Sequence, residues 1–411
     1  MTAIAIQAEV PTIEEFETAG RAFLEANAPK RSVEAFVWGK GTQDVSLFPE
    51  RTPEEDLVNL EIARTWAQKV YDAGFGWITG PVEYGGRGLT KEHQQAWSAL
   101  YASFDTPSLS IYGIGLGMVA PTILDHATDE VKEAYLAKMW RGDIVACQLF
   151  SEPSSGSDLA SLQTRAVRDG DEWVLNGQKV WTSGAQVSDI GEIICRTDPD
   201  LPKHRGLTGF VVDMHAPGVE VRPLRQMTGG ASFNEVFFTD VRVPDSHRLG
   251  DVNGGWTVAL TTLMNERAAI GGGGGGVGLP ATTRLIESAK ATGRNTDPLI
   301  RQQLADIVIN ERVARYTNQR AMAKIAAGEL PGPEMSLAKM SLTANMLRTN
   351  EVLDAIFGMS LTADTGAWGT FAWTEYLLGV PGMRIAGGSD EVLRNIIGER
   401  VLGLPKEPNP A

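Results

Sequence analysis

The sequence predicts an α+β protein with a helical N-terminal domain, a middle antiparallel β-barrel or sandwich, and a C-terminal helical bundle. Apolar residues recur at helical spacing early in the chain, short β-rich runs follow up to about residue 245, and helical spacing then returns. The chain lacks strand–helix–strand alternation, which argues against a parallel nucleotide-binding sheet. We place the three domains at residues 1–143, 144–248 and 249–411.

The N-terminal domain is expected to be mainly helical over residues 11–146. Thr12 supplies a capping hydroxyl, and acids fill the first turn ahead of apolar residues at helical spacing, as at a typical helix start. Residues 33–52 show no clear period and are expected to form a long loop. Helical spacing resumes at Pro53, and the glycine-rich stretch at residues 74–88 is expected to be irregular.

The middle domain is predicted from short runs rich in β-branched and aromatic residues. Asp169-Gly170 and Asn176-Gly177 have the composition of hairpin turns between such runs. Closely spaced short strands favour a small barrel or sandwich. The expected strands are residues 144–150, 164–168, 172–175, 190–195, 208–212, 219–223 and 235–243. The expected helices of the last domain lie near residues 255–290, 298–327, 333–357, 366–378 and 388–402.

Composition argues against several classes of protein. The net charge of −14, without a basic block, argues against a nucleic-acid surface. Cys147 and Cys195 cannot form a disulfide framework and are interpreted as small buried hydrophobes rather than redox thiols. The histidines are scattered without metal-site spacing. Without a signal-peptide-like start or a run of about 20 apolar residues, we expect a cytoplasmic protein with no membrane span.

Two segments carry most of the chemical information. Residues 148–158 combine small hydroxyl side chains and a glycine with an acid and a proline, which suits a loop that cradles an anionic or amide-rich cofactor. Residues 176–183 place Trp181 between a β-branched residue and two hydroxyls, as a strand lining a flat ring would. The alternatives are ordinary turn hydroxyls for the serines and a core aromatic for Trp181.

Together these segments resemble the acyl-CoA dehydrogenase family of FAD enzymes. The stretch at residues 81–88 resembles the family's P-x-x-Y-G-G-x-G signature, residues 235–244 the strand that closes its middle domain, and residues 389–403 its C-terminal helix. The resemblance implies the three-domain fold, usually assembled as a tetramer. It also implies oxidation of the Cα–Cβ bond of an acyl-CoA substrate: a carboxylate removes the α-proton, and the β-hydride passes to flavin N5. The electrons would then pass to an electron-transfer flavoprotein.

The expected catalytic base depends on a position at which this chain departs from the family pattern. Many members carry the acid in a Y-E-G-T motif before the last helix, where this chain has Gly387. Isovaleryl-CoA and long-chain acyl-CoA dehydrogenases place it instead at a Glu-Arg pair on a bundle helix, which matches Glu266 and Arg267. We therefore expect Glu266 to be the base and the Gly387 backbone N–H, with the flavin ribityl hydroxyl, to hold the thioester oxygen. The alternatives are Glu391 as the base and Glu266 as a solvated helix residue.

The remaining site residues are implied by matching position. Ser151 would lie near flavin N5, and Gly156 and Ser157 near the phosphates or the thioester arm. The resemblance assigns substrate contacts to Ser157 and Arg267. It assigns cofactor contacts to Gln148, Phe150 (through its backbone), Ser151, Gly156, Ser157, Trp181, Thr182, Ser183, Arg294, Ser389 and Glu391.

Two features depart from the family pattern. The motifs that hold the adenine end of FAD across a subunit interface are reduced here to residues 293–298 and 355–360, so a mixed tetramer with a related subunit is an alternative to a homotetramer. A partner-dependent subunit, an acyl-CoA oxidase and a flavin monooxygenase also remain open. The run Gly271–Gly276 follows no strand and is not a dinucleotide fingerprint. It is either a helix break or tight helix contact, or a device that widens the acyl pocket. Acyl chain length, branching and ring content cannot be predicted from the sequence.

Overall fold

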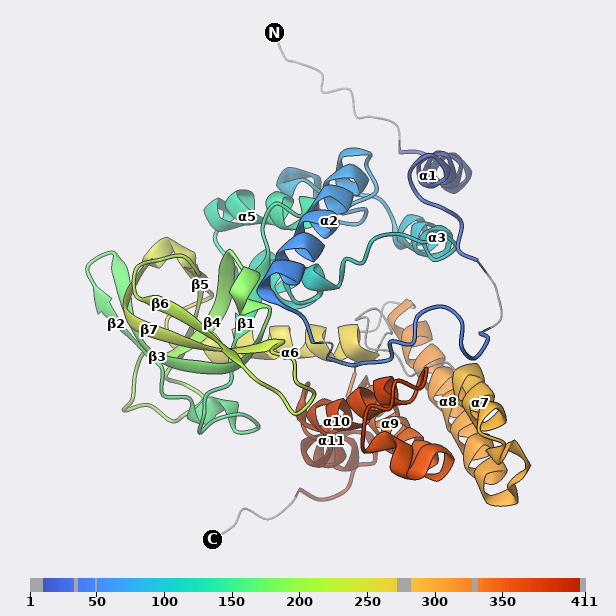
Figure 1. The fold of residues 1–411 in the computed structure, drawn as a ribbon. Coiled ribbons are helices and arrows are strands. Elements are labelled where there is room, and N and C mark those ends of the chain that lie inside the picture. The colour runs from blue at the N-terminus through green and yellow to red at the C-terminus, as the bar shows by residue number, and fades with distance from the viewer. Residues whose placement is uncertain are drawn as a thin grey trace.

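The structure of the protein is a computed structural model. It describes residues 10–32, 36–48, 50–271, 282–326, 332–333 and 335–406, with the backbone alone for residues 267–271 and 325–326. A helical region, a sheet and a second helical region follow one another along the chain (Figure 1), so the predicted fold class is confirmed. None of the described helices is both long enough and apolar enough to cross a lipid bilayer.

The N-terminal region is helical, and its first two helices begin where the sequence indicates. At the first helix the Thr12 N–H donates to Glu15 Oε2 at 2.8 Å, while the Glu15 N–H donates back to Thr12 Oγ1 at 3.2 Å. The second helix has the same reciprocal cap at Thr52, with Pro53 in its first turn. The helices are α1 (Ile13–Asn27), α2 (Pro53–Asp72), α3 (Lys91–Tyr101), a π-helical turn at Gly115–Val119, α4 (Ala120–His126) and α5 (Asp129–Arg141).

The middle region is one curved sheet with the strand order β6-β7-β3-β2-β4-β5-β8, and β1 adds to β4. The strands are β1 (Ala146–Leu149), β2 (Arg165–Asp169), β3 (Glu172–Ser183), β4 (Ile190–Arg196), β5 (Leu207–Asp213), β6 (Val219–Leu224), β7 (Phe233–Pro244) and β8 (Arg248–Leu249). Most pairs are antiparallel as predicted, but β1 runs parallel to β4, and β2 meets β4 in a parallel pair. The parallel pairs arise because β2 and β3 form a hairpin, after which the chain returns beside β1 in the same direction.

The strands β1, β4 and β5 are buried on both faces. Cys147, Ile193 and Phe210 point into a core enclosed by the curved sheet. Ile194 and Val211 point the other way, into a core shared with the helices that cover the sheet. Covered strands therefore form near-continuous apolar runs, and a polar residue within one of them requires a specific explanation.

The C-terminal region contains α6 (Gly255–Gly271), α7 (Thr282–Ala291), α8 (Pro298–Ala326), α9 (Met335–Phe357), α10 (Phe371–Ile385) and α11 (Asp390–Ile396), which continues as a π-helical turn at Ile397–Val401. In Figure 1, α6 passes from the sheet toward the bundle, while α7 and α8 lie on the side away from the sheet. The prediction that a helix ends near residue 378 was wrong, because α10 continues through Pro381. Burial of Tyr376, Val380 and Met383 in the bundle core compensates for the hydrogen bond that proline cannot make.

Candidate active site

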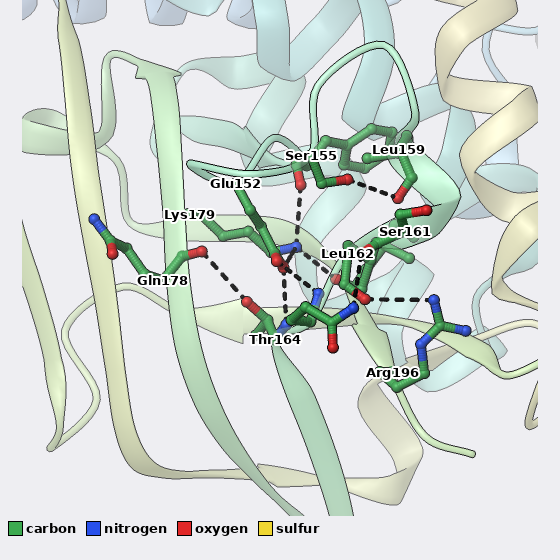
Figure 2. A network of polar contacts seen from close by, with 12 residues as sticks. Glu152, Ser155, Leu159, Ser161, Leu162, Thr164, Gln178, Lys179 and Arg196 are labelled. Atoms are coloured by element: carbon green, nitrogen blue, oxygen red, sulfur yellow. Dashed lines mark hydrogen bonds and ion pairs between the residues drawn. The ribbon is translucent and has the colours of Figure 1, made fainter. Parts of the chain in front are cut away.

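A buried ion pair fixes the loop that the sequence assigns to the flavin. The Lys179 ammonium group on β3 is fully buried and donates to Glu152 Oε1 at 2.9 Å (Figure 2). It also donates to the carbonyls of Phe150 at 3.0 Å and Ile194 at 2.9 Å. One cation therefore joins the start of the loop to two strands of the sheet.

The Glu152 carboxylate is also held by backbone donors. The Gln163 N–H donates to Glu152 Oε2 at 2.6 Å, and the Thr164 N–H donates to Oε1 at 2.9 Å. Burial alone would raise the pKa of Glu152, but the positive charge of Lys179 and these hydrogen bonds outweigh it and hold the pKa below its ordinary value. Burial lowers the pKa of Lys179, and the negative charge of Glu152 opposes this effect. A buried pair with this many hydrogen-bond partners rigidifies the loop.

Trp181 has the backbone and exposure of a binding residue. Its φ is 61°, and it lies in β3 where the register with β7 shifts between Lys179 and Thr182. The indole is 57% exposed and lies edge-on to Phe233 at 6.1 Å between ring centroids. A tryptophan in the left-handed region costs about 1–3 kcal/mol, and such bulges re-aim side chains beside active sites. The alternative of a core aromatic is excluded by the exposure.

The residues around Trp181 differ in burial and in hydrogen bonding. Thr182 is buried, and its hydroxyl has no hydrogen-bond partner within the described chain. Ser183 is half-buried and borders a cavity of about 220 Å³ between the end of β3 and the N-terminal helical region. The Val180 N–H donates to the Ser151 carbonyl at 2.8 Å, which brings the two predicted flavin segments side by side. The half-buried Gln148 and the exposed Gly156 and Ser157 belong to the first of these segments.

Glu266 lies on α6, one turn after Thr262. The Thr262 hydroxyl donates to Glu192 Oε1 on β4 at 2.6 Å, so this face of α6 meets the sheet. Glu266 is half-buried, and its charge contributes to raising the pKa of Glu192. These observations disfavour a fully solvated helix residue. The side chain of Arg267 and the residues Gly272–Gly276 lie outside the described part of the structure, and Gly271 ends α6.

Gly387 lies in a turn between α10 and α11 that glycine is needed to make. Its φ is 64° and that of Gly388 is 91°, which are values that residues with side chains rarely adopt. A glutamate at position 387 would be strained in this backbone, which gives a physical reason for an acid supplied from elsewhere. Ser389 caps α11 by accepting from the Val392 N–H at 3.3 Å. Glu391 is exposed and pairs with Arg394 at 3.5 Å, unlike a buried catalytic acid.

A second buried lysine holds this turn. Lys339 of α9 is 1% exposed and donates to the carbonyls of Arg384 at 3.0 Å and Gly388 at 2.8 Å. Its third partner is Asp390, at 3.3 Å, which also accepts from Thr343 at 2.9 Å. The carbonyls on both sides of Gly387 are therefore tied to α9.

Arg294 is not brought to the other predicted residues within one chain. It is exposed in the connection between α7 and α8, which Figure 1 shows on the side of the bundle away from the sheet. Five buried charged residues were not predicted from the sequence: Glu152, Lys179, Glu192, Lys339 and Asp390. Lys179, Glu192 and Lys339 do have a signal, a charged residue at a buried position of a strand or helix, whereas Glu152 in its loop and Asp390 in the first turn of α11 have none. Both cysteines are buried, and burial raises the pKa of Cys147 to about 12, as a structural thiol requires.

Comparison with known proteins gives matches along most of the chain. Family models for the N-terminal, middle and C-terminal domains of acyl-CoA dehydrogenases match residues 49–143, 147–241 and 253–402. The acyl-CoA dehydrogenase IpdE1 of Mycobacterium tuberculosis is 36% identical over 86% of this chain and 91% of its own length.

Two solved structures have the same architecture. One is described as the Tcur3481-Tcur3483 steroid ACAD and matches with a TM-score of 0.74 and 27% identity over 96% of this chain and 98% of its own. The other is the ChsE4-ChsE5 complex from Mycobacterium tuberculosis, with a TM-score of 0.69 and 27% identity over 98% of this chain and 100% of its own. Together with the full set of domain matches, these likenesses show that the chain belongs to the acyl-CoA dehydrogenase family, whose members are flavoprotein oxidoreductases acting on acyl-CoA.

Proposed function

We propose that this protein is an FAD-dependent acyl-CoA dehydrogenase that converts an acyl-CoA thioester to the 2-enoyl-CoA, with Glu266 as the α-proton base. The proposal is supported by what the chain has at two positions, 266 and 387. Glu266 is a half-buried carboxylate on the face of α6 that meets β4, whereas the position of the acid in many relatives is Gly387 in a left-handed turn. The base has therefore moved from one side of the site to the other.

The residues present fit an isoalloxazine ring. The exposed indole of Trp181, held by a strained bulge, offers a flat surface, and Ser151 and Ser183 offer hydroxyls beside it. Bound FAD would accept the hydride that leaves Cβ, which no side chain can do. Gln148, Phe150, Thr182, Ser389 and Glu391 would complete the cofactor site, with Gly156 and Ser157 near the phosphates.

The chain's own residues would perform the proton chemistry. Glu266 would take the α-proton, and the Gly387 N–H would donate to the thioester oxygen as negative charge develops there. Lys339 supports that donor because it holds the carbonyls on both sides of the turn. Ser157 and Arg267 would contact the CoA part of the substrate.

The substrate we favour is a bulky lipid acyl-CoA. The architectural neighbour with the TM-score of 0.74 is described as a steroid ACAD. A glycine run that begins at Gly271, about one helical turn after Glu266, would leave room for a branched or ring-bearing acyl group beside the base. An electron-transfer flavoprotein would receive the electrons. An acyl-CoA oxidase or flavin monooxygenase on the same fold is the second candidate.

A tetramer, homomeric or mixed, is the assembly we propose. On α8, Ile309, Val313 and Tyr316 follow helical spacing and are each more than half exposed, which is typical of an interface. Arg294 belongs to the connection between α7 and α8, which lies on the side of the bundle away from the sheet (Figure 1), and this place suits a residue that reaches the FAD of a neighbouring subunit. The two-component descriptions of the architectural neighbours favour a related subunit as partner.

The test is an absorption spectrum of the purified protein, repeated anaerobically with a panel of acyl-CoAs. A flavin spectrum that is bleached by an acyl-CoA in the wild type but not in Glu266→Gln supports both the activity and the base. Glu351→Gln is the matched control, because Glu351 is an exposed carboxylate on α9 with no role in the proposed chemistry, and its loss should leave bleaching intact. Equal bleaching in Glu266→Gln and the wild type would move the base elsewhere. Protein that is colourless until a related subunit is co-expressed would favour the partner-dependent alternative.

A further inference from the structure

Glu192 is a buried acid for which the proposed chemistry has no assigned role. It lies in the middle of β4 and is fully buried, on the face that α6 covers. Its surroundings on that face are apolar and include Ile190, Ile194 and Val258. A carboxyl group in such a place costs free energy unless each oxygen finds a partner.

One of the two carboxyl oxygens has a partner. Glu192 Oε1 accepts from the Thr262 hydroxyl at 2.6 Å, and Thr262 in turn lies 2.9 Å from the Thr122 hydroxyl. Glu192 Oε2 makes no hydrogen bond to any group that the structure describes. Burial raises the pKa of Glu192 to about 8, and the negative charge of Glu266 adds to this effect. The group is therefore a neutral acid near pH 7, able both to donate and to accept a hydrogen bond.

Glu192 lies next to two elements that are expected to take part in the reaction. Gln148 of β1 is the register partner of Glu192 and belongs to the segment expected to cradle the flavin. On the other side, Thr262 and Glu266 are one helical turn apart on α6. Glu192 thus lies between the expected flavin strand and the helix of the expected base.

We propose that Glu192 is a specificity-determining residue whose unpaired carboxyl oxygen hydrogen-bonds an oxygen substituent on the acyl group of the substrate. The inference rests on the proposed function. The preferred substrate class is then an acyl-CoA with a hydroxyl or keto oxygen beyond Cβ. A neutral acid suits both groups because it donates to a keto oxygen and exchanges donor and acceptor roles with a hydroxyl. A site that leaves a buried polar group unpaired discriminates against the analogue that lacks the matching atom.

The kinetic test uses two replacements of similar size. Glu192→Met removes both oxygens, whereas Glu192→Gln stays neutral and keeps a donor and an acceptor. Each is assayed with acyl-CoAs that carry one oxygen at successive positions from Cγ onward and with the unsubstituted parents. The ratio of kcat/KM, oxygenated over parent, should fall about 10- to 100-fold in Glu192→Met and stay near the wild-type ratio in Glu192→Gln. An unchanged ratio in Glu192→Met at every position would overturn the proposal.

An infrared difference spectrum tests the same contact without turnover when Glu266→Gln is the background for all samples, because that variant cannot take the α-proton. The C=O band of a protonated carboxyl group should be present in this background and absent when Glu192→Gln is added, and it should shift when an oxygenated acyl-CoA binds but not when the parent binds. A shift on flavin loading alone would make the cofactor the partner and overturn the proposal. A band that no ligand moves would do the same and indicate a buried water. If no acyl-CoA bleaches the flavin, the proposed function fails, while this band still reports whether Glu192 meets a ligand.

Discussion

The sheet region contains two buried glutamates, Glu152 and Glu192, whose surroundings shift their pKa values in opposite directions. Glu152 is 6% exposed and is met by Lys179 and two backbone N–H groups. Glu192 is 0% exposed and has Thr262 on one oxygen. The pKa of Glu152 lies below its ordinary value, whereas that of Glu192 is raised to about 8. Both carboxyl groups are buried, so the difference in their hydrogen-bond and ionic partners decides whether each one is charged.

The difference in partners gives Glu152 a structural role and leaves Glu192 with one oxygen that can bind a ligand. Both oxygens of Glu152 are used to fix the loop that is expected to hold the flavin, and a charged group so fully paired has no capacity left for a ligand. Glu192 keeps one oxygen unpaired beside the helix that carries Glu266. Two carboxyl groups whose surroundings push their pKa values apart are a pattern typical of active sites.

The largest effect should come from breaking the Glu152 pair. Lys179→Met leaves the Glu152 carboxylate buried without its cation, and we expect a loss of about 3–5 kcal/mol in the free energy of unfolding, measured by guanidinium denaturation at pH 7. The double variant with Glu152→Gln should recover part of this loss, because the neutral amide still accepts from one of the backbone N–H groups. A loss below about 1 kcal/mol in the single variant would mean that the pair does not hold the loop.

Much of the fold could be predicted from the sequence because its signals are local. The capping box at Thr12 and the proline at position 53 mark helix starts without reference to the rest of the chain. The two predicted flavin segments do lie side by side, joined by the hydrogen bond from Val180 to Ser151. The extent of α10 could not be predicted, because the local signal of Pro381 is overcome by burial of its neighbours in the bundle.

The role of Glu192 could not be predicted for the same kind of reason. The run from Ile190 to Cys195 is apolar apart from Glu192, which is typical of a strand covered on both faces, but a lone acid usually faces water and the run does not reveal that α6 packs on it. The burial of Lys179 likewise depends on contacts with Glu152 and with Ile194, which are distant in sequence. The resemblance could identify residues that match a motif, but not residues whose importance comes from what packs on them.

The two acids should give opposite pH dependences of stability. Folded Glu192 keeps its proton between its ordinary pKa of 4.5 and about 8 while the unfolded chain loses it, so its contribution to stability falls as the pH rises through this window. The slope is at most about 1.4 kcal/mol per pH unit. Glu152 has a lowered pKa, so its contribution is present above 4.5 and is lost as the pH falls below that value.

Both pH dependences can be tested by denaturation of the wild type, Glu192→Gln and Glu152→Gln from pH 4 to pH 9, which gives the free energy of unfolding of each protein. The stability difference between the wild type and Glu192→Gln should shrink or reverse toward pH 8, whereas that for Glu152→Gln should shrink toward pH 4. Parallel curves for the wild type and Glu192→Gln would show that Glu192 is ionised in the folded protein.

The smallest effect we expect is at Thr262, and its size depends on the charge of its partner. Thr262→Val removes the donor to Glu192 Oε1, and a hydrogen bond to a neutral acid contributes about 1 kcal/mol, against about 1.5–3 kcal/mol for a charged one. The destabilisation should therefore be small at pH 6 and grow above pH 8. Thr122→Val is the matched control, because Thr122 contacts Thr262 but has no hydrogen bond to Glu192 among those the structure describes. An equal cost of Thr262→Val at both pH values would mean that Glu192 does not change its charge in this range, and the contrast with Glu152 would then lie in packing alone.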